Sequence, residues 1–196
     1  MYFVIKRAFD LFLVIFLAPI WLPLMAVLAV LVKLTSAGPV FFKQKRYGRH
    51  RHFFMIYKFR SMYTNAPKDT PTHLLQNPAS FITPVGRVLR KTSLDELPQL
   101  LNILKGDLSI VGPRPALWNQ DDLIAEREKY GANAVPVGLT GLAQVSGRDA
   151  LSIEKKAACD GEYVRRKGFF FDLWIMVRTV GCVLTRFGIF EGGPKN

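Results

Sequence analysis

The sequence GRVLRKTSLDELPQLLNILKGDLSIVGPRP occupies residues 86–115 and combines a helical apolar pattern with an unusual concentration of charge. Its leucines recur at the i, i+3, i+4 and i+7 positions of a helix, as Leu97, Leu100, Leu101 and Leu104. This spacing predicts an amphipathic helix whose leucine face packs into a core. Two adjacent carboxylates, Asp95 and Glu96, stand directly before it, and Arg87, Arg90 and Lys91 lie just upstream.

The start of this helix has two possible registers. In the first, Ser93 and Glu96 form a capping box, and Pro98 then falls inside the helix, where it removes a hydrogen bond. In the second, Asp95 is the N-cap and Pro98 lies in the first turn, where proline is tolerated. Both registers leave Asp95 at the positive helix end, where the dipole and nearby cations favour its ionised form. Such a carboxylate serves either as a plain cap or as a nucleophile toward a phosphorus bound by a metal and arginines.

Composition limits the class of protein. The chain has 196 residues, which is the size of one domain with a substantial core. Its formal charge of +12 indicates an anionic partner, which could be nucleic acid, acidic lipid or a phosphorylated substrate. Hydrophobic residues make up 49% of the chain, which favours contact with a membrane. The two cysteines and three histidines lack metal-ligand spacing, so no zinc site is expected.

Residues 11–32 form an uninterrupted apolar segment that is long enough, as a helix, to cross a bilayer. Cationic residues flank both of its ends, so both ends are drawn to the cytoplasmic side. Pro19 and Pro23 fall in its middle, and each removes an intrahelical hydrogen bond. Two interpretations therefore stay open, a single span and a re-entrant hairpin that dips into the membrane and returns.

Two aromatic-rich segments, residues 40–44 and 53–60, predict the strands of a β-hairpin. The basic stretch at residues 43–52 is expected to contact lipid headgroups, with nucleic acid as the alternative ligand. Lys58 and Arg60 alternate with aromatic residues, so they share one face of the second strand. On that face the two cations could bind a phosphate.

The residues after the leucine helix supply two further arginines. Arg114 stands between two prolines, which stiffen the backbone that presents its guanidinium group. A guanidinium held in this way matches a pair of phosphate oxygens, although a surface arginine in a turn has the same pattern. Residues 137–148 contain three glycines and end at Arg148, which suits either turns or the close approach of a ligand. They lack the spacing of a dinucleotide-binding or P-loop motif.

The C-terminal third predicts two more helices. The first covers residues 152–167 and carries Asp160, a third candidate carboxylate. The second begins at residue 169 and places apolar side chains, including Phe187, on one face and polar ones, including Arg186, on the other. This pattern is typical of a helix that lies at a membrane surface. A helix of a soluble core is the alternative.

Taken together and in order, these motifs resemble the bacterial sugar transferases, and more narrowly the small monotopic phosphoglycosyl transferases of the capsule type. The resemblance covers nearly the whole chain. It rests on the apolar start and on YKFRSM at 57–62, SLDELPQL at 93–100, KGD at 105–107, VGPRP at 111–115 and GLTGLAQVSGR at 138–148.

The resemblance implies an α+β, mainly helical fold with a small β-hairpin and amphipathic interfacial helices. It implies a re-entrant membrane helix over residues 1–36 and a cytoplasmic catalytic domain over residues 37–196. Such a monotopic protein would enter the bacterial inner membrane from its cytoplasmic face without crossing it. The family breaks its membrane helix at a Ser-Pro pair, and the matching pair here is Ala18-Pro19, which lacks the serine hydroxyl.

The resemblance also implies a reaction, the transfer of a sugar 1-phosphate from a UDP-sugar to undecaprenyl phosphate with release of UMP. This step would initiate the assembly of a capsule, exopolysaccharide, O-antigen or glycan. By the resemblance, Asp95 is the nucleophile that forms a phosphosugar-aspartyl intermediate, Glu96 is its partner, and Mg²⁺ binds beside them with Asp160 as a further ligand. The basic residues assigned to the substrates are Lys58, Arg90, Arg114 and Arg148.

Two questions of function stay open at this level. The capsule-type motifs favour an N-acetylated hexosamine as the sugar, and a hexose such as glucose or galactose is the alternative. From another class, a basic membrane-anchored nucleic-acid-binding or scaffold protein would also account for the charge. The transferase hypothesis expects UDP-sugar, undecaprenyl phosphate and membrane lipids as partners, expects no nucleic acid, and is compatible with a homodimer.

Overall fold

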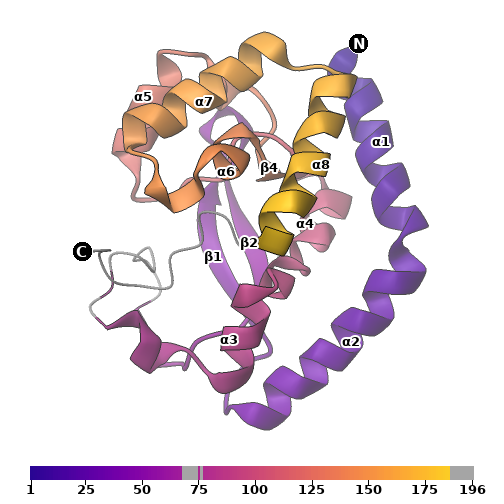
Figure 1. The fold of residues 1–196 in the computed structure, drawn as a ribbon, viewed down its shortest axis with the longest axis vertical. Helices are drawn as coiled ribbons and strands as arrows, with labels where there is room; N and C mark the ends of the chain where they lie inside the picture. The colour runs from indigo at the N-terminus through magenta and orange to yellow at the C-terminus, as the bar shows by residue number, and fades with distance from the viewer. Residues whose placement is uncertain (68–74, 76, 186–196) are drawn as a thin grey trace.

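The structure is a computed structural model that describes residues 1–67, 75 and 77–185 and is mainly helical (Figure 1). Its helices are α1 Tyr2–Phe16, α2 Ala18–Thr35, α3 Pro84–Lys91, α4 Gln99–Lys105, α5 Asp121–Glu128, α6 Leu142–Ser146, α7 Ile153–Arg166 and α8 Phe169–Thr185. Its strands are β1 Phe41–Tyr47, β2 Phe53–Phe59, β3 Ser109–Val111 and β4 Gly138–Thr140. The α+β, mainly helical fold class is therefore confirmed.

The predicted β-hairpin is present. Strands β1 and β2 pair antiparallel, with Phe41 opposite Phe59 at one end and Tyr47 opposite Phe53 at the other. Arg60 lies just beyond β2, and its Nη2 donates to the carbonyl oxygen of Ser36 at 2.6 Å and to its hydroxyl at 2.7 Å. The phosphate-binding role predicted for Arg60 is wrong, because its guanidinium group fastens the end of α2 to the hairpin.

The leucine pattern does form a helix, but both predicted starts are wrong. The α-helix begins at Gln99, directly after Pro98, whose side chain supplies no cap. Ser93 adopts the left-handed conformation, with φ of 57°, and its side chain caps no backbone N–H. A short 3₁₀ turn, η4 (Leu94–Glu96), follows it and carries both carboxylates. Pro98 itself occupies the N-cap position, so the regular helix starts after it.

The apolar N-terminal segment is broken at Leu17 into α1 and α2, one residue before the predicted Ala18-Pro19 pair. Figure 1 shows the two helices meeting at an angle, with their junction at the outer edge of the molecule. A narrow stripe packs inward, and it consists of Val14, Trp21, Leu28 and Val32. The outward face is apolar and exposed, and it includes Phe12, Ile15, Phe16, Ile20, Val27, Val30 and Leu34. By length and composition alone, α2 could cross a membrane.

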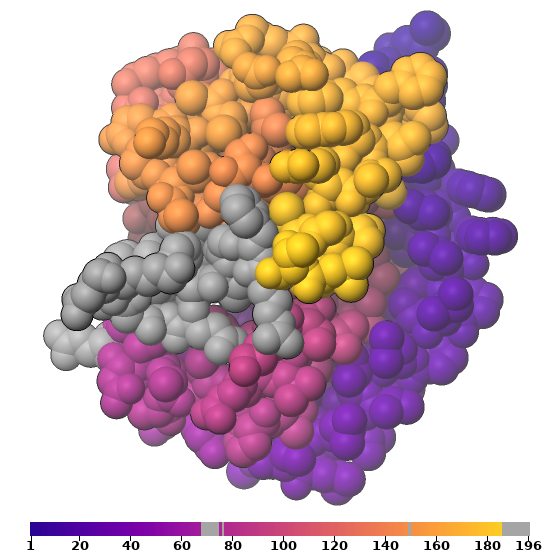
Figure 2. Space-filling view, viewed as in Figure 1, coloured from indigo at the N-terminus to yellow at the C-terminus, as the bar shows by residue number. Residues whose placement is uncertain are grey.

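Both ends of this broken helix are tied to the same body. Near the start of α1, the Lys6 ammonium group pairs with the Asp172 carboxylate of α8 at 2.6 Å. At the end of α2, Ser36 accepts the hydrogen bonds from Arg60. Figure 2 shows the surfaces of α8 and α1 adjoining along one edge of the molecule. The re-entrant hypothesis requires both ends on one side, and this arrangement agrees with that requirement.

A parallel pair of short strands, β3 and β4, lies at the centre of the fold, with Val111 opposite Thr140. Two glycines permit their close approach. A Cβ atom on Gly138 would overlap the backbone of Val111 and Gly112, and one on Gly112 would overlap the backbone of Pro136. The glycines of this region therefore serve tight packing of the strands, and that packing places the loop after β3, which carries Arg114.

Helix α8 presents its apolar face outward. Its exposed side chains are Phe169, Phe170, Leu173, Trp174, Val177, Val180 and Leu184. Its inward face combines Ile175, which is fully buried, with the buried Asp172 and with Thr179, whose hydroxyl lies 2.7 Å from that of Thr140, while Arg178 and Thr185 are exposed. A helix in water does not normally expose so long a row of apolar side chains, so the predicted interfacial character agrees with the structure. Arg186 and Phe187, which were assigned to this helix, lie outside the described residues.

Candidate active site

Glu96 is the centre of a buried cluster of charges. Its Oε1 accepts hydrogen bonds from Lys58 Nζ at 2.7 Å and from Arg114 Nη2 at 2.6 Å. Burial alone would raise the pKa of Glu96, but the charges and hydrogen bonds of Arg114 and Lys58 outweigh it and hold this pKa well below its ordinary value. Glu96 is therefore ionised, and Lys58 and Arg114 both donate to its Oε1 atom.

Asp95 has the opposite electrostatic character. It is buried, with 8% of its surface exposed, and this burial raises its pKa above the ordinary value. The positive charge of Lys58 opposes the shift, the adjacent negative charge of Glu96 adds to it, and the charges of Arg90 and Arg114 oppose it. The lowered pKa that the helix dipole predicts for Asp95 is wrong, because desolvation outweighs the charges around it.

Lys58 reaches Glu96 because α4 is pinned to the edge of β2. The Asn102 side chain of α4 accepts from the Tyr57 backbone N–H at 3.0 Å and donates to the Met55 carbonyl at 2.8 Å. The Asn102 side chain thereby makes the hydrogen bonds that the backbone of a neighbouring strand would make on that edge of β2. Burial and the nearby arginines lower the pKa of Lys58, and the charge of Glu96 opposes this shift.

Arg114 comes from the loop between β3 and α5. Its side chain is 37% exposed, more than that of Glu96 at 14%, so Arg114 pairs with Glu96 and remains partly open to solvent. Arg46 of β1 lies close behind this loop and donates from Nη1 to the Pro115 carbonyl at 2.9 Å. Sequence reasoning placed Arg46 only in the basic stretch and missed this position.

The other predicted substrate contacts lie around the same cluster. Arg90 of α3 is near enough to Asp95 to lower its pKa, and its Nε is buried with no hydrogen-bond partner in the described part of the chain. Arg148 follows α6 in the left-handed conformation, with φ of 50°. It lines the same cavity as Glu96 and Arg114. The structure therefore brings Lys58, Arg90, Arg114 and Arg148 to one region.

Asp160 does not join the carboxylate pair. It is fully buried on α7, and its Oδ2 accepts from Arg127 Nε at 2.8 Å and pairs with Arg127 Nη2 at 2.7 Å. Within the described residues, no group of three or more His, Cys, Asp and Glu side chains could hold a metal ion. The structure thus gives no support to Asp160 as a metal ligand, because a buried carboxylate finds its charge partner in the nearest arginine.

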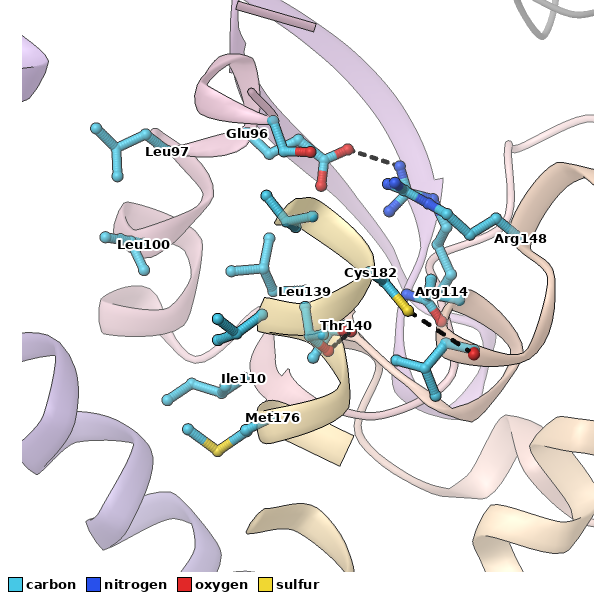
Figure 3. A pocket seen from close by; sticks show the side chains of 16 residues that line it. Glu96, Leu97, Leu100, Ile110, Arg114, Leu139, Thr140, Arg148, Met176 and Cys182 are labelled. Carbon is cyan, nitrogen blue, oxygen red and sulfur yellow. Dashed lines mark hydrogen bonds and ion pairs between the residues drawn. The ribbon is translucent and has the colours of Figure 1, made fainter. Parts of the chain in front are cut away.

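A cavity of about 340 Å³ opens beside the charged cluster (Figure 3). Its wall is apolar over most of its area and is built from α4, β3, β4, α6 and α8, with Leu97, Leu100, Ile110, Leu139 and Met176 among its residues. Glu96, Arg114 and Arg148 lie together at one end (Figure 3). Gln144 also lines it, and neither amide atom of this buried side chain has a hydrogen-bond partner among the described residues. The cavity therefore suits a ligand with an apolar body and an anionic head.

The sequence model of the bacterial sugar transferase family matches residues 1–186. The chain belongs to this family. The sugar transferase is 45% identical to the uncharacterized sugar transferase EpsL of Bacillus subtilis (strain 168), over 95% of this chain and 90% of EpsL. It is 40% identical to the UDP-glucose:undecaprenyl-phosphate glucose-1-phosphate transferase of Caulobacter vibrioides, over 92% of this chain and 70% of that protein.

A third relative has a different sugar in its name. The sugar transferase is 38% identical to the undecaprenyl-phosphate galactose phosphotransferase of Salmonella typhimurium, over 95% of this chain and 42% of that longer protein. Membership of the family makes the chain an enzyme of the transferase class. It favours the transferase hypothesis over the scaffold alternative that the charge alone left open.

Sequence reasoning missed three residues that shape this site. Asn102, Arg46 and Arg127 each bond to the backbone of a distant segment. The leucine pattern gave no signal for Asn102, because helical spacing puts this residue on the face opposite the leucines, yet the structure buries it completely. A buried polar side chain needs hydrogen-bond partners, so such a position points to a structural contact.

Proposed function

We propose that this sugar transferase moves a sugar 1-phosphate from a UDP-sugar to undecaprenyl phosphate and releases UMP. The observation that carries the proposal is the carboxylate pair Asp95 and Glu96, held among cations at the charged end of an apolar cavity. The named relatives support it, because their names state this reaction with glucose or galactose. The site combines the two chemistries that such substrates need, which are charge neutralisation for phosphates and an apolar surface for a lipid.

In the proposed first step, an Asp95 carboxylate oxygen attacks the phosphorus that bears the sugar. A new bond forms between oxygen and phosphorus, and the bond from that phosphorus to the oxygen of UMP breaks, so UMP leaves with the electron pair. In the second step, a phosphate oxygen of the lipid attacks the same phosphorus and releases the Asp95 carboxylate. Only the ionised carboxylate is nucleophilic, and the charges of Lys58 and Arg90 favour that form against the effect of burial.

The cationic side chains have distinct roles in this proposed reaction. Lys58 and Arg114 hold Glu96 ionised beside the nucleophile. The exposed part of Arg114 and the side chains of Arg90 and Arg148 are placed to contact the phosphates of donor and acceptor. Preorganised positive charge of this kind stabilises the charge that develops on the phosphoryl oxygens in the transition state.

The carboxylate pair fits a magnesium ion. Mg²⁺ binds in proteins through one or two carboxylates and completes its shell with water and substrate phosphates. Asp95 and Glu96 are adjacent carboxylates, and Lys58 and Arg114 both bond to the Oε1 atom of Glu96, so the pair offers carboxylate oxygens for such a ligand set. Bound there, Mg²⁺ would neutralise charge on the diphosphate and the leaving UMP.

The apolar cavity is the proposed site for the first isoprene units of the acceptor. Its charged end would then hold the lipid phosphate near Arg114 and Arg148, and its apolar wall would cover the chain. The exposed apolar faces of α8 and of α1–α2 would lie in the cytoplasmic leaflet, with residues 1–36 as the re-entrant element and residues 37–196 as the catalytic domain. Exposed apolar surface of this extent is unusual for a soluble monomer and marks a membrane contact.

We propose an N-acetylated hexosamine as the sugar, with glucose or galactose as the alternative. The support is the likeness of the 92–102 and 112–120 segments to capsule-type enzymes. The place of the reaction would be the first membrane step of polysaccharide or glycan assembly, at the cytoplasmic face of the bacterial inner membrane.

The test is release of UMP by purified protein in nanodiscs that contain undecaprenyl phosphate, with Mg²⁺ and a panel of UDP-sugars. We expect lipid-dependent release with one donor, and loss of that release in Asp95→Asn. Asp122→Asn is the matched control, because Asp122 is an exposed aspartate on α5, outside the cluster. Full turnover by folded Asp95→Asn would remove Asp95 as the nucleophile, and no release with any donor would refute the reaction.

A further inference from the structure

The backbone carbonyl groups around Arg114 receive hydrogen bonds from three different elements. The Pro113 carbonyl accepts from the Gly138 N–H of β4 at 2.9 Å. The Arg114 carbonyl accepts from Arg127 Nη2 of α5 at 2.9 Å, and the Pro115 carbonyl accepts from Arg46 Nη1 of β1, also at 2.9 Å. Such a series is unusual in a loop that belongs to neither helix nor sheet, because loop carbonyls normally face water.

Each of the two arginines is itself held by a buried side chain. Arg127 is bound by Asp160 through Nε and Nη2, and the side chains of this pair are 4% and 0% exposed. Arg46 is bound by Gln44, whose Oε1 accepts from Nη2 at 2.6 Å and from Nε at 3.1 Å. Each guanidinium group therefore spans two fixed points, with its anchor on one side and a loop carbonyl on the other.

We infer that Arg127 and Arg46, with their anchors Asp160 and Gln44, are positioning residues that clamp the backbone at Arg114 and at the residue after it, and so aim the Arg114 guanidinium group at Glu96. Any effect of this clamp on turnover rests on the proposed function, in which Arg114 contacts phosphate. Its effect on the backbone does not depend on the reaction.

Arginine suits this task better than lysine does. A guanidinium group is planar and donates in several directions at once, whereas an ammonium group is a single point charge on a flexible chain. Arg127 uses this geometry to bond Asp160 and the Arg114 carbonyl together. An exchange of arginine for lysine keeps the charge but shortens the side chain by one atom and removes the planar fork, so at least one of the two bonds is lost and the exchange tests geometry apart from charge.

The two halves of the clamp differ in charge. Arg127 is neutralised by Asp160, while the partner of Arg46 is an uncharged amide. Burial and the nearby charge of Arg114 lower the pKa of Arg46 to about 9. Arg46 therefore adds positive charge behind the Arg114 loop, which the charge of Glu96 partly balances, whereas the Arg127–Asp160 pair acts through geometry alone.

The first measurement is hydrogen–deuterium exchange of the backbone amides at residues 112–120 in the full chain in nanodiscs. Arg127→Lys and Arg46→Lys should each raise the exchange rate of this segment about tenfold or more, because the loop then opens with less loss of hydrogen bonding. Arg165→Lys is the matched control, since Arg165 is an exposed arginine of α7 that pairs with Glu162. Unchanged exchange in both clamp variants would overturn the inference, whatever the activity of the protein.

The second measurement is a double-mutant cycle on kcat/KM for UMP release. In the native background, Arg127→Lys should lower kcat/KM about tenfold to a hundredfold, as small misplacements of a catalytic group do. In an Arg114→Ala background the same substitution should change it less than about twofold, because its target is gone. Equal losses in both backgrounds would show a general structural role and refute the clamp. If Arg127→Lys does not fold, Asp160→Asn tests the same coupling with an isosteric change.

Discussion

The carboxylate of Asp172, near the start of α8, ties α1 to the body of the protein. Its Oδ2 accepts from Lys6 Nζ at 2.6 Å and from the Tyr2 hydroxyl at 2.7 Å, and its Oδ1 accepts from the Tyr163 hydroxyl at 3.0 Å. The side chains of Lys6 and Asp172 are 4% and 9% exposed. We predict that Asp172→Asn, which keeps the shape and removes the charge, destabilises the protein by leaving Lys6 buried without this counter-ion.

The size of the effect follows from these contacts. Breaking a buried ion pair by removing one partner costs about 3–5 kcal/mol. Asp10 lies one helical turn from Lys6, and the two charges interact. In Asp172→Asn the charge of Asp10 still balances part of the charge of Lys6, so the lower end of this range applies. For a chain of this size, 1 kcal/mol corresponds to about 2–4 °C in Tm. A loss of about 3 kcal/mol therefore predicts a fall in Tm of about 6–12 °C.

The assay is thermal unfolding followed by circular dichroism, with all variants in the same detergent. Glu162→Gln is the control, because Glu162 forms exposed ion pairs with Arg165 and Arg166 and its loss should change Tm by less than about 2 °C. The double variant Lys6→Met, Asp172→Asn should be more stable than Asp172→Asn alone, since it no longer buries an unpaired charge. A fall below about 2 °C for Asp172→Asn, or no recovery in the double variant, would refute this reasoning.

Three further predictions concern the reaction and the membrane. UMP release should fall as the pH drops through the pKa of Asp95, which burial raises above its ordinary value of about 3.9. Glu96→Gln removes a negative charge that raises this pKa, so its acid limb should move to lower pH, and an upward move would contradict the assignment. Removal of Mg²⁺ with a chelator should abolish UMP release, and added Mg²⁺ should restore it; undiminished turnover with chelator would exclude the metal. Val27→Asp on α2 should shift the chain out of the membrane fraction, because a charge within the bilayer costs about 2.5–3.5 kcal/mol. Val88→Asp on α3 is the control and should cause no such shift; Val88 is 59% exposed and Val27 is 57% exposed. Equal distributions of these two variants would argue against insertion of α2.

Local patterns in the sequence were sufficient to predict several helices and strands of the fold. The leucine spacing at residues 97–104 marked α4, and the aromatic alternation marked the β1–β2 hairpin. The prolines within the apolar segment indicated a break, which lies at Leu17. The helix predicted over residues 152–167 is α7, which begins at Ile153 with the Ser152 hydroxyl accepting from the Lys155 N–H as its cap. These features depend on side-chain periodicity and backbone chemistry within a few residues, so they can be predicted from the sequence alone.

The ionisation of the candidate site was decided only by tertiary structure. Sequence reasoning predicted that Asp95 is held in its ionised form. In the folded protein, burial raises the pKa of Asp95, whereas nearby cations hold the pKa of Glu96 well below its ordinary value. The two residues are adjacent in the chain and have the same local environment in sequence. They differ because Lys58 and Arg114, 38 and 18 residues away, both meet Glu96.

The same physical reason explains the residues that were misassigned or missed. Arg60, Asp160, Arg46 and Arg127 all carry charges that a sequence can assign to a ligand, and each has a distant partner within the fold. The charge of a side chain is a local property, and the sequence determines it. The choice between a ligand and another part of the chain depends on which groups share its low-dielectric surroundings, and only packing brings those groups together.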